Sequence, residues 1–304
     1  MLPDIDSLAL FVRAAELRSL TKAAEASHIG LAAASRRMAL LEHRFSTTLF
    51  ERSSRGVELT AAGASLLPHA RALLVELNQM QAEMRDHANG RKGALRLLAN
   101  TSVITDTLPD DLAAFAHHNP DVQVVVEERW SEEIVRALQA AEADVGIVVE
   151  GTVADGLETL PYCMDRLAVV MPHDHPLAAF PSLGLNNVLD DELITLEGGA
   201  SMTRLLAAQA AIAERTLQLR VQVRSFEAVC HMVAAGLGLG LLPERAAQVL
   251  AKGLDLTVRP LHEPWATRRM LLCLRKERGS TPSVSKLLTF LCGRGHLPEA
   301  TDNP

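Results

Sequence analysis

Residues 19–63 read SLTKAAEASHIGLAAASRRMALLEHRFSTTLFERSSRGVELTAAG, and this stretch decides the fold of the first part of the chain. Its spacing of small and apolar residues predicts one helix from about Thr21 and a second over 31–44. A turn at 28–30 joins them, and Gly30 supplies the backbone freedom that a sharp turn needs. Two helices joined by so short a turn are typical of a helix-turn-helix.

The second of these helices is predicted to have an inner and an outer face. Ala34, Met38 and Leu41 recur at helical spacing, so they are expected to face a core. The outer face carries small side chains, a hydroxyl and a guanidinium, from Ala32, Ala33, Ser35, Arg36 and Ala39. Such a face lets a helix backbone approach the major groove of DNA, where an arginine reaches a guanine edge or a phosphate. The competing interpretation is an ordinary alanine-rich helix with a solvated face.

Residues 49–59 favour the DNA-binding interpretation because they predict a short basic hairpin beside that helix. Leu49 and Phe50 form an apolar pair that can close the bottom of the helices. The polar residues 51–56 are turn-prone, and 57–59 alternate like a return strand. Arg52 and Arg55 at such a tip are placed for phosphate or minor-groove contact.

Residues 8–63 resemble the winged helix-turn-helix of the LysR-type transcriptional regulators. The resemblance rests on a long, ordered set of residues: Phe11, Ala14, Ala15, Ser19, Leu20, Thr21, Ala23, Ala24, Ser35, Leu41, Glu42, Leu49, Phe50, Glu51, Arg52 and residues 59–63. The length and organisation of the rest of the chain also suit that family. The resemblance implies that the DNA-contacting residues are Thr21, Ala32, Ala33, Ser35, Arg36, Arg37, Arg52 and Arg55.

The start of the second helix departs from the family pattern. The family usually has Ser-Gln-Pro or Ser-Gln-Ser at this point, whereas residues 30–32 are Gly-Leu-Ala. Glycine caps a helix less well than serine. Leu31 cannot make the paired amide contact to adenine that a glutamine makes. The base preferences of the family are therefore not expected to transfer, and Ala32 or Ala33 against a thymine methyl is a substitute.

Composition limits where positive charge can lie. The chain has 304 residues, enough for two or three domains, and 48% of them are hydrophobic but only 3% aromatic. Its formal net charge is −7, which excludes a surface that is basic throughout.

The four cysteines are scattered without CxxC spacing, which predicts reduced, mostly buried thiols in a cytoplasmic protein; a redox-sensing pair is the alternative. No secretion signal or membrane-spanning run is predicted.

Residues 61–89 predict a long helix that pairs with another helix. Leu66, Ala70, Leu73, Leu77, Met80 and Met84 alternate spacings of four and three, which is a heptad seam. The competing interpretation is an amphipathic helix that lies on its own domain. Pairing is favoured because a symmetric dimer doubles the DNA contacts and binds a two-fold-related site.

Beyond a predicted hinge at 90–93, apolar strand-like runs alternate with amphipathic helices. Continuous apolar strands joined by helices imply a parallel sheet covered on both faces. The predicted fold class is therefore a multidomain α+β protein: a winged helix-turn-helix over 1–60, a linker helix over 61–89, and an α/β effector domain over 94–304. Within that domain, subdomain I is expected at about 94–161 with 266–304, and subdomain II at about 162–265.

The two expected subdomains resemble periplasmic solute-binding proteins, as the effector domain of the LysR family does. Ligands of such sheets bind in the crevice outside the carboxyl ends of the strands. The candidate effector-binding residues are Asn100, Thr101, Ser102, Ser131, Gly199, Ser201 and Phe226. The hydroxyls near residue 100 would suit a carboxylate or another anion, and the competing interpretation for each hydroxyl is a helix cap.

Catalytic, metal and nucleotide sites are not predicted. The run of glycines at 236–240 lies inside an apolar segment, so we expect a helix end that leads into a buried strand. His117 with His118, and His173 with His175, lack further ligands at metal-binding spacing. No nucleophile elbow and no fixed pair of carboxylates is present.

The sequence therefore predicts a sequence-specific transcriptional regulator that is no enzyme, needs no cofactor and is cytoplasmic. Its expected partners are operator DNA, a small effector between the subdomains for which an anion is the favoured class, a second copy in a homodimer that extends to a homotetramer, and RNA polymerase. Two alternatives remain open from the residues alone. One is a constitutive DNA-binding regulator without an effector, and the other is an enzyme tethered to DNA.

Overall fold

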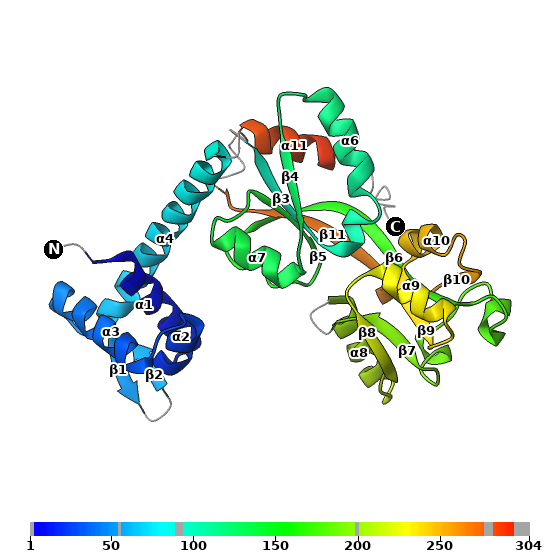
Figure 1. Ribbon diagram of the computed structural model, residues 1–304, viewed down its shortest axis with the longest axis horizontal. Helices are drawn as coiled ribbons and strands as arrows, with labels where there is room; N and C mark the ends of the chain where they lie inside the picture. The colour runs from blue at the N-terminus through cyan, green and yellow to red at the C-terminus, as the bar shows by residue number, and fades with distance from the viewer. Residues whose placement is uncertain (1–2, 54–55, 89–93, 198–200, 277–281, 295–304) are drawn as a thin grey trace, which may run out of the picture. The chain divides into compact units, whose positions relative to one another are not determined.

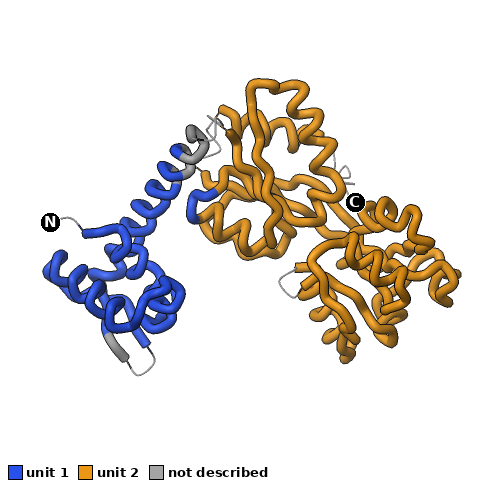
Figure 2. Tube along the Cα trace, in the orientation of Figure 1, with its two compact units in different colours: residues 1–90, 140–142 blue, residues 91–139, 143–304 orange. Residues whose placement is uncertain are grey.

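A computed structural model describes residues 3–53, 56–88, 94–197, 201–276 and 282–294. The chain divides into two compact units, residues 1–90 with 140–142 and residues 91–139 with 143–304 (Figure 2). The predicted hinge at 90–93, Arg55 and Gly199 lie outside the described residues. None of the described helices is long and apolar enough to span a bilayer.

The first unit is a bundle of short helices followed by a hairpin and a long helix (Figure 1). Its core is formed by the inner faces of the first three helices, among them Phe11, Met38 and Leu41, and the ring of Phe11 lies 5.2 Å from that of Phe50. Ser19 caps the second helix by accepting a hydrogen bond from the Lys22 amide. The elements are α1 (Ile5–Leu17), α2 (Leu20–Ala26), α3 (Leu31–Phe45), β1 (Phe50–Ser53), β2 (Gly56–Leu59) and α4 (Ala61–Ala88).

The turn between α2 and α3 corrects the role expected for Gly30. The left-handed residue is His28, with φ 53°, whereas Gly30 has φ −69° and is the N-cap of α3. The amides of His28 and Ile29 donate back to the carbonyls of Glu25 and Ala24, which is a Schellman helix ending. The glycine is therefore not needed for its backbone freedom, because the chain has already turned two residues earlier.

The heptad seam of α4 is used in two different ways. Ala70 is buried, and Leu66 packs beside it against the core of the first three helices. Leu73, Met80 and Met84 are 60%, 51% and 56% exposed. The first part of the seam thus holds α4 to its own domain, as the competing interpretation expected, and the exposed part leaves an apolar stripe along the helix.

The second unit is built on a mixed sheet with strand order β4-β3-β5-β11-β6-β9-β7-β8, with β10 paired to β6. The expectation of parallel strands is therefore met only within each half of the sheet. β3, β4 and β5 are parallel to one another, and so are β7, β8 and β9, but β6 and β11 run antiparallel to their neighbours. The strands are β3 (Leu95–Ala99), β4 (Val124–Glu128), β5 (Val145–Val149), β6 (Glu158–Pro172), β7 (Leu193–Leu196), β8 (Leu219–Val223), β9 (Leu239–Pro243), β10 (Leu256–Pro260) and β11 (Thr267–Leu274).

Helices cover this sheet and separate it into two lobes with cores of their own (Figure 1). We call the part with β3, β4 and β5 lobe I and the part with β7, β8, β9 and β10 lobe II. β6 and β11 run through both. The helices of lobe I are α5 (Thr101–Ile104), α6 (Leu108–His118), α7 (Ser131–Gln139) and α11 (Pro282–Cys292), and those of lobe II are α8 (Ser201–Ile212), α9 (Phe226–Ala234) and α10 (Glu244–Leu250), with short 3-10 turns at Pro176–Ala179, Leu185–Asn187 and Pro264–Ala266.

The glycines at 236–240 connect α9 to β9, which confirms the expected helix end before a buried strand. Gly238 has φ 144°, and a Cβ built on it would lie 2.2 Å from the carbonyl oxygen of Glu192. This close approach of two backbones explains a glycine at this position without a nucleotide.

Candidate nucleic-acid interface and ligand cleft

The outer face of α3 carries small side chains and Arg36, with Leu31 and Leu40 also exposed toward its ends. Ala32, Ala33 and Arg36 are exposed, whereas Ser35 is only half-exposed and so lies at the edge of this face rather than at its centre. Below them Ala34, Met38 and Leu41 are buried in the core, so the helix cannot roll over to hide this face. A helix with small exposed side chains and one cation has the shape and charge to enter a groove in DNA.

The arginines of α3 differ in whether a carboxylate already holds them. Arg36 has no ion pair or hydrogen bond to any described residue, so its guanidinium is available. Nη1 of Arg37 lies 3.2 Å from Oδ2 of Asp6, and Nη1 of Arg44 lies 3.1 Å from Oδ2 of Asp4. Arg37 is therefore shared with Asp6 of α1, which fits the expectation that it adds positive charge or a phosphate contact while Arg36 enters the groove.

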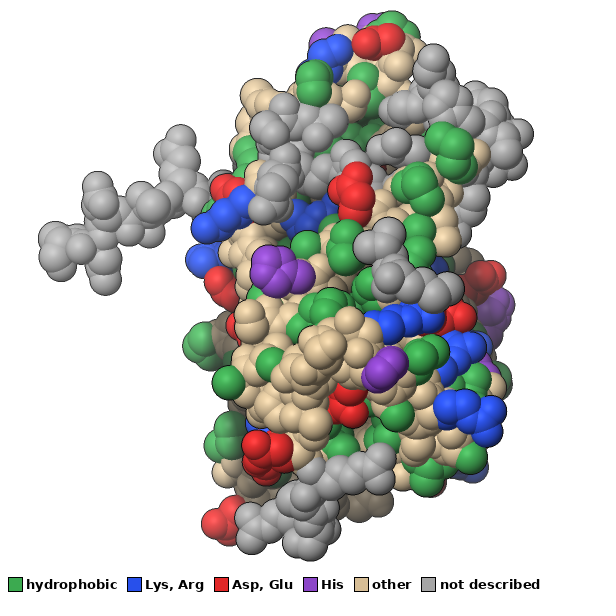
Figure 3. All heavy atoms as spheres, turned by 90° about the vertical axis from the view of Figure 1, so that its left-hand side faces the viewer, with side chains coloured by type: hydrophobic (Ala, Val, Ile, Leu, Met, Phe, Trp, Pro, Cys, Tyr) green, Lys and Arg blue, Asp and Glu red, His purple; other side chains and the backbone are tan. Residues whose placement is uncertain are grey.

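The remaining predicted DNA contacts lie on the elements that flank α3. Thr21 is exposed in the first turn of α2, and Arg52 lies in β1 of the wing. Oε1 of Glu42 accepts hydrogen bonds from the amides of Leu49 (2.7 Å) and Phe50 (3.3 Å), which fixes the start of the wing on the end of α3. Figure 3 shows Lys and Arg side chains in small groups among acidic and apolar ones, as the net charge of −7 requires.

In the second unit, the predicted effector residues gather around one small cavity of about 20 Å³. Asn100, Thr101 and Ser102 follow β3, Ser131 begins α7, and Ser201 and Phe226 begin α8 and α9. All of them line this cavity, together with Trp130, Leu196, Met202 and Arg268. The strand ends of both lobes thus meet at one place, but the space between them is about the size of one water molecule.

Two of these polar side chains are already occupied within the protein. Oδ1 of Asn100 accepts a hydrogen bond from the Val103 amide and caps α5, so the helix-cap interpretation holds for this residue. The hydroxyl of Thr101 donates to the carboxylate of Glu128. Neither side chain is aimed freely at a ligand.

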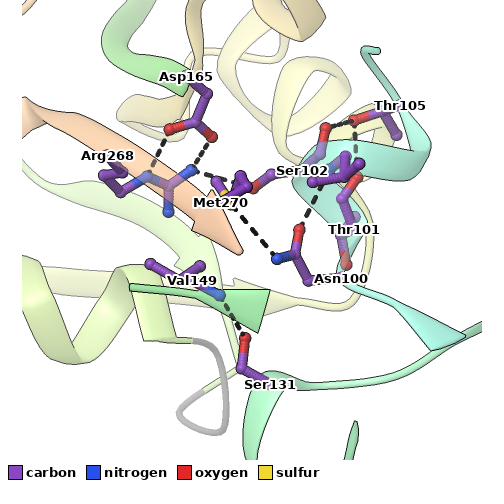
Figure 4. Close-up of polar contacts among 10 residues, drawn as sticks. Asn100, Thr101, Ser102, Thr105, Ser131, Val149, Asp165, Arg268 and Met270 are labelled. Atoms are coloured by element: carbon purple, nitrogen blue, oxygen red, sulfur yellow. Dashed lines mark hydrogen bonds and ion pairs between the residues drawn. The ribbon is translucent and has the colours of Figure 1, made fainter. Parts of the chain in front are cut away.

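The hydroxyls of Ser102 and Ser131 differ from the side chains of Asn100 and Thr101, because each accepts a hydrogen bond and keeps its own hydrogen. Oγ of Ser102 accepts from Arg268 (3.0 Å), and Oγ of Ser131 accepts from the Val149 amide (3.3 Å) (Figure 4). No described residue accepts from either hydroxyl. Each therefore keeps its hydrogen for donation to another group.

The residues that the sequence did not predict here are Arg268 on β11 and Asp165 on β6. They lie directly opposite each other across the two strands, and only 5% and 9% of them are exposed. Nε of Arg268 donates to Oδ1 of Asp165 at 2.8 Å, and Nη2 donates to Oδ2 (Figure 4). A signal was present, because Arg268 shares the buried parity of its strand with Met270 and Leu272.

A second cavity of about 300 Å³ adjoins the first through Ser201 and Arg268, which line both. Its other lining residues come from lobe I (Glu132, Val149, Glu150, Gly151 and Thr152) and from lobe II (Arg204 and Leu205). Arg204 forms an ion pair with Glu132 across the lobes, and Glu150 pairs with Arg269 at 3.1 Å. This volume is at the lower end of the range for small-molecule pockets.

The cysteines do not contribute to either cavity. Burial raises the pKa of Cys163 to about 12 and those of Cys230 and Cys273 to about 11, so these side chains are thiols at neutral pH. Since the thiolate is the reactive form, three buried thiols are poorly suited to redox sensing. Among the residues that the structure describes, no three His, Cys, Asp or Glu side chains are grouped to hold a metal ion.

Comparisons with known proteins match both units of the chain. A family model described as "LysR substrate binding domain" matches residues 88–294, and one described as "Bacterial regulatory helix-turn-helix protein, lysR family" matches residues 5–64. The chain is 28% identical to a "Probable hydrogen peroxide-inducible genes activator" of Mycobacterium avium over 94% of this chain and 92% of that protein.

Two solved structures show the same fold at lower identity. Full-length CbnR in complex with its target DNA has a TM-score of 0.55 and 22% identity, over 95% of this chain and 98% of that one. The effector-binding domain of QuiR in complex with shikimate has a TM-score of 0.59 and 20% identity, over 66% of this chain and 95% of that one.

Proposed function

This chain belongs to the LysR family of transcriptional regulators, and from that premise we propose which of its residues bind DNA and which bind the effector. It is a DNA-binding regulator under the control of a small molecule. The observation that carries the proposal for DNA is the outer face of α3, where small side chains surround Arg36, a guanidinium without a partner among the described residues.

In this proposal α3 lies in the major groove. Ala32 and Ala33 contact base edges and thymine methyl groups, and Arg36 donates to a guanine or to a phosphate. Ser35, at the edge of the face, donates to a phosphate, as does Thr21 from α2. Arg52 and Arg55 anchor the wing on the backbone, and Arg37 adds positive charge while it remains paired with Asp6.

The exposed stripe of α4 supports a homodimer through this helix. Leu73, Met80 and Met84 are more than half exposed in the single chain, and burial of each against a second copy would contribute about 1–2 kcal/mol. Met80→Glu should therefore convert the dimer to a monomer in analytical ultracentrifugation. A dimer that persists with this substitution would remove α4 from the interface.

The effector is proposed to bind where the strands of both lobes end, against Ser102, Ser131, Ser201 and Phe226. Gly199 stays a contact predicted from sequence. Asn100 and Thr101 shape the site rather than hold the ligand, because their polar atoms are already paired. We take subdomain I as about 94–161 with 266–304 and subdomain II as about 162–265. A tetramer, a contact with RNA polymerase, a cytoplasmic location and the absence of catalysis complete the proposal.

The test of the DNA-binding face uses full-length protein and DNA fragments selected from a genomic library. Ala33→Glu places a carboxylate at the centre of the proposed face and should abolish selection at physiological salt. Ala64→Glu introduces the same change at an exposed position of α4 and serves as the matched control. Equal loss in both variants, or retention in both, would contradict the assignment of α3.

A further inference from the structure

We propose that Arg268 binds the effector directly and that the effector presents a single carboxylate to it. This inference rests on the proposed ligand cleft of the second unit and names the chemical class that the cleft accepts. It starts from the guanidinium of Arg268, which lies at the junction of the small and the large cavity.

The guanidinium of Arg268 is nearly fully buried but only partly paired. Its Nε and one terminal nitrogen donate to Asp165, and that nitrogen also donates to Ser102. No described residue accepts from the remaining nitrogen, Nη1, and Figure 4 shows it pointing away from Asp165 on the side of Val149 and Ser131. Nη1 is not among the sealed, unpaired side-chain atoms of the described residues, so a ligand oxygen can reach it and accept a charge-assisted hydrogen bond.

The groups beside Nη1 are donors as well. The hydroxyls of Ser102 and Ser131 each accept one hydrogen bond from the protein, and neither donates to a described residue, so each has its hydrogen to offer. No aspartate or glutamate is among the described residues that line the small cavity. A site with three donors and no anionic acceptor selects a ligand group that only accepts, and an ionised carboxylate is such a group.

The size of the two cavities decides how the ligand would be placed. The small cavity of about 20 Å³ has room for one oxygen-sized group, whereas the adjoining cavity of about 300 Å³ has room for the body of a small molecule. Val149 and Leu205 offer apolar contact to that body. The carboxylate of the ligand would therefore bind in the small cavity, next to Arg268 where the two cavities join, and the rest of the ligand would occupy the large cavity.

The charges around the large cavity favour one carboxylate over two or over a phosphate. Its lining carries two carboxylates, Glu132 and Glu150, and two guanidiniums, Arg204 and Arg268. The carboxylate of Asp165 already neutralises the positive charge of Arg268, so the site lacks the net positive charge needed to hold a dianion. Asp165 is thus a positioning residue, which fixes the guanidinium plane so that Nη1 faces the ligand.

The test uses acetate as the smallest stable monocarboxylate and acetamide as its neutral counterpart of similar shape. Binding to the full-length protein is followed by saturation-transfer NMR at constant ionic strength, with inorganic phosphate as a third probe. Acetate should bind at least about tenfold more tightly than acetamide and more tightly than phosphate, because only a carboxylate gains charge-assisted hydrogen bonds without a second charge. Absence of acetate binding at 100 mM, or equal binding of acetamide or phosphate, would overturn the inference.

The variants remove the charge pair as a whole. Arg268→Gln alone leaves Asp165 buried without a partner and endangers folding. The double variant Asp165→Asn with Arg268→Gln removes both charges and should weaken acetate at least about tenfold. Arg269→Gln, the exposed neighbour on the same strand, is the matched control and should bind acetate as wild type does.

A further variant and the DNA assay make every outcome decisive. Ser131→Ala deletes one donor without a buried charge and should weaken acetate about fivefold, which tests the site even if the double variant fails to fold. Unchanged acetate affinity in Ser131→Ala and in the folded double variant would refute the assignment. DNA selection is measured on the same samples: selection without carboxylate binding refutes this inference alone, and carboxylate binding without DNA selection refutes the proposed DNA-binding face alone.

Discussion

The sharpest prediction for DNA binding compares two neighbouring arginines of α3. Arg36→Ala and Arg37→Ala remove the same side chain from adjacent positions, but only Arg37 is tied to a carboxylate, Asp6 at 3.2 Å. Arg36 has no partner among the described residues, so its whole donor capacity is available to DNA. We therefore expect the two substitutions to differ in their effect on DNA affinity and on stability.

The magnitudes follow from these contacts. Loss of an arginine that contacts a base or phosphate costs about 1–3 kcal/mol per domain, which is about a 5- to 140-fold increase in Kd. If two domains of a dimer bind together, the cost rises to about 2–6 kcal/mol. Arg37→Ala should raise Kd by less than about tenfold and lower the stability of the domain by about 0.2–1 kcal/mol, since it breaks an exposed ion pair.

The assay is fluorescence anisotropy with a selected DNA fragment at several salt concentrations between about 50 and 200 mM. If Arg36 contacts a phosphate, Arg36→Ala should reduce the salt slope by about 0.9 for each contact that is lost. Asp6→Asn releases Arg37 and should strengthen DNA binding slightly. A Kd for Arg36→Ala that equals that of wild type at fixed salt, or a larger effect of Arg37→Ala, would refute the assignment of Arg36.

Four further predictions concern the folded state. Tyr162→Phe removes a buried 2.6 Å hydrogen bond to Asp111, so urea denaturation should show a loss of about 1.5–3 kcal/mol. Gly63→Ala adds a methyl group 2.2 Å from a backbone oxygen at the entry to the wing and should lower the melting temperature of the DNA-binding domain, with a cost of about 1–3 kcal/mol. At pH 8 a disulfide reagent should label the exposed Cys292 well before Cys163, because burial raises the pKa of the Cys163 thiol to about 12. Because the folded state holds that proton more tightly than the unfolded state does, this thiol should make stability fall as pH rises above 9, and Cys163→Ala should flatten the fall in pH-dependent denaturation.

The helices of the first unit could be predicted from sequence because their signals are local. The pattern of buried residues in α3 predicted a helix over 31–44, and the structure has Leu31–Phe45. His28 escaped prediction, since the left-handed position of a helix ending usually goes to glycine and one lay two residues away. Which turns of the α4 seam are buried in the domain and which stay exposed also escaped prediction, because heptad spacing does not distinguish them.

The mixed sheet could not be predicted in the same way. β6 and β11 pair although they are more than a hundred residues apart, and no local period encodes such a pairing. Pro161 argued against a strand that begins at Glu158. It is tolerated because it lies opposite Leu271, where the register shifts by one residue and the ladder is already irregular.

The site residues show the same division. Ser102 and Ser131 could be found because both follow strands and begin helices, a local feature. Arg268 and Asp165 could not be paired without the register of β6 against β11. The sequence marks each of them separately, as a charged residue at a position of its strand that alternation predicts to be buried. The alternation does not tell which opposite charge lies beside it.

The placement of Arg268 explains how a small ligand could reset the two lobes. The only ion pair named above that joins them at the large cavity, Glu132 with Arg204, is about half-exposed on both sides, so it contributes about 1 kcal/mol or less. A second ion pair also joins the lobes, from Arg245 of α10 to the buried Asp106 at 3.1 Å. A carboxylate bound to a buried guanidinium contributes about 1.5–3 kcal/mol.

Arg268 lies on β11, a strand that passes through both lobes, and the serines around it come from both lobes. If the carboxylate binds one lobe setting better by about 2 kcal/mol, the ratio of the two settings changes about 30-fold. The bound ligand would then contribute more to the setting than the exposed Glu132–Arg204 pair does. The coupling would be set by a single guanidinium nitrogen that has no acceptor among the described residues.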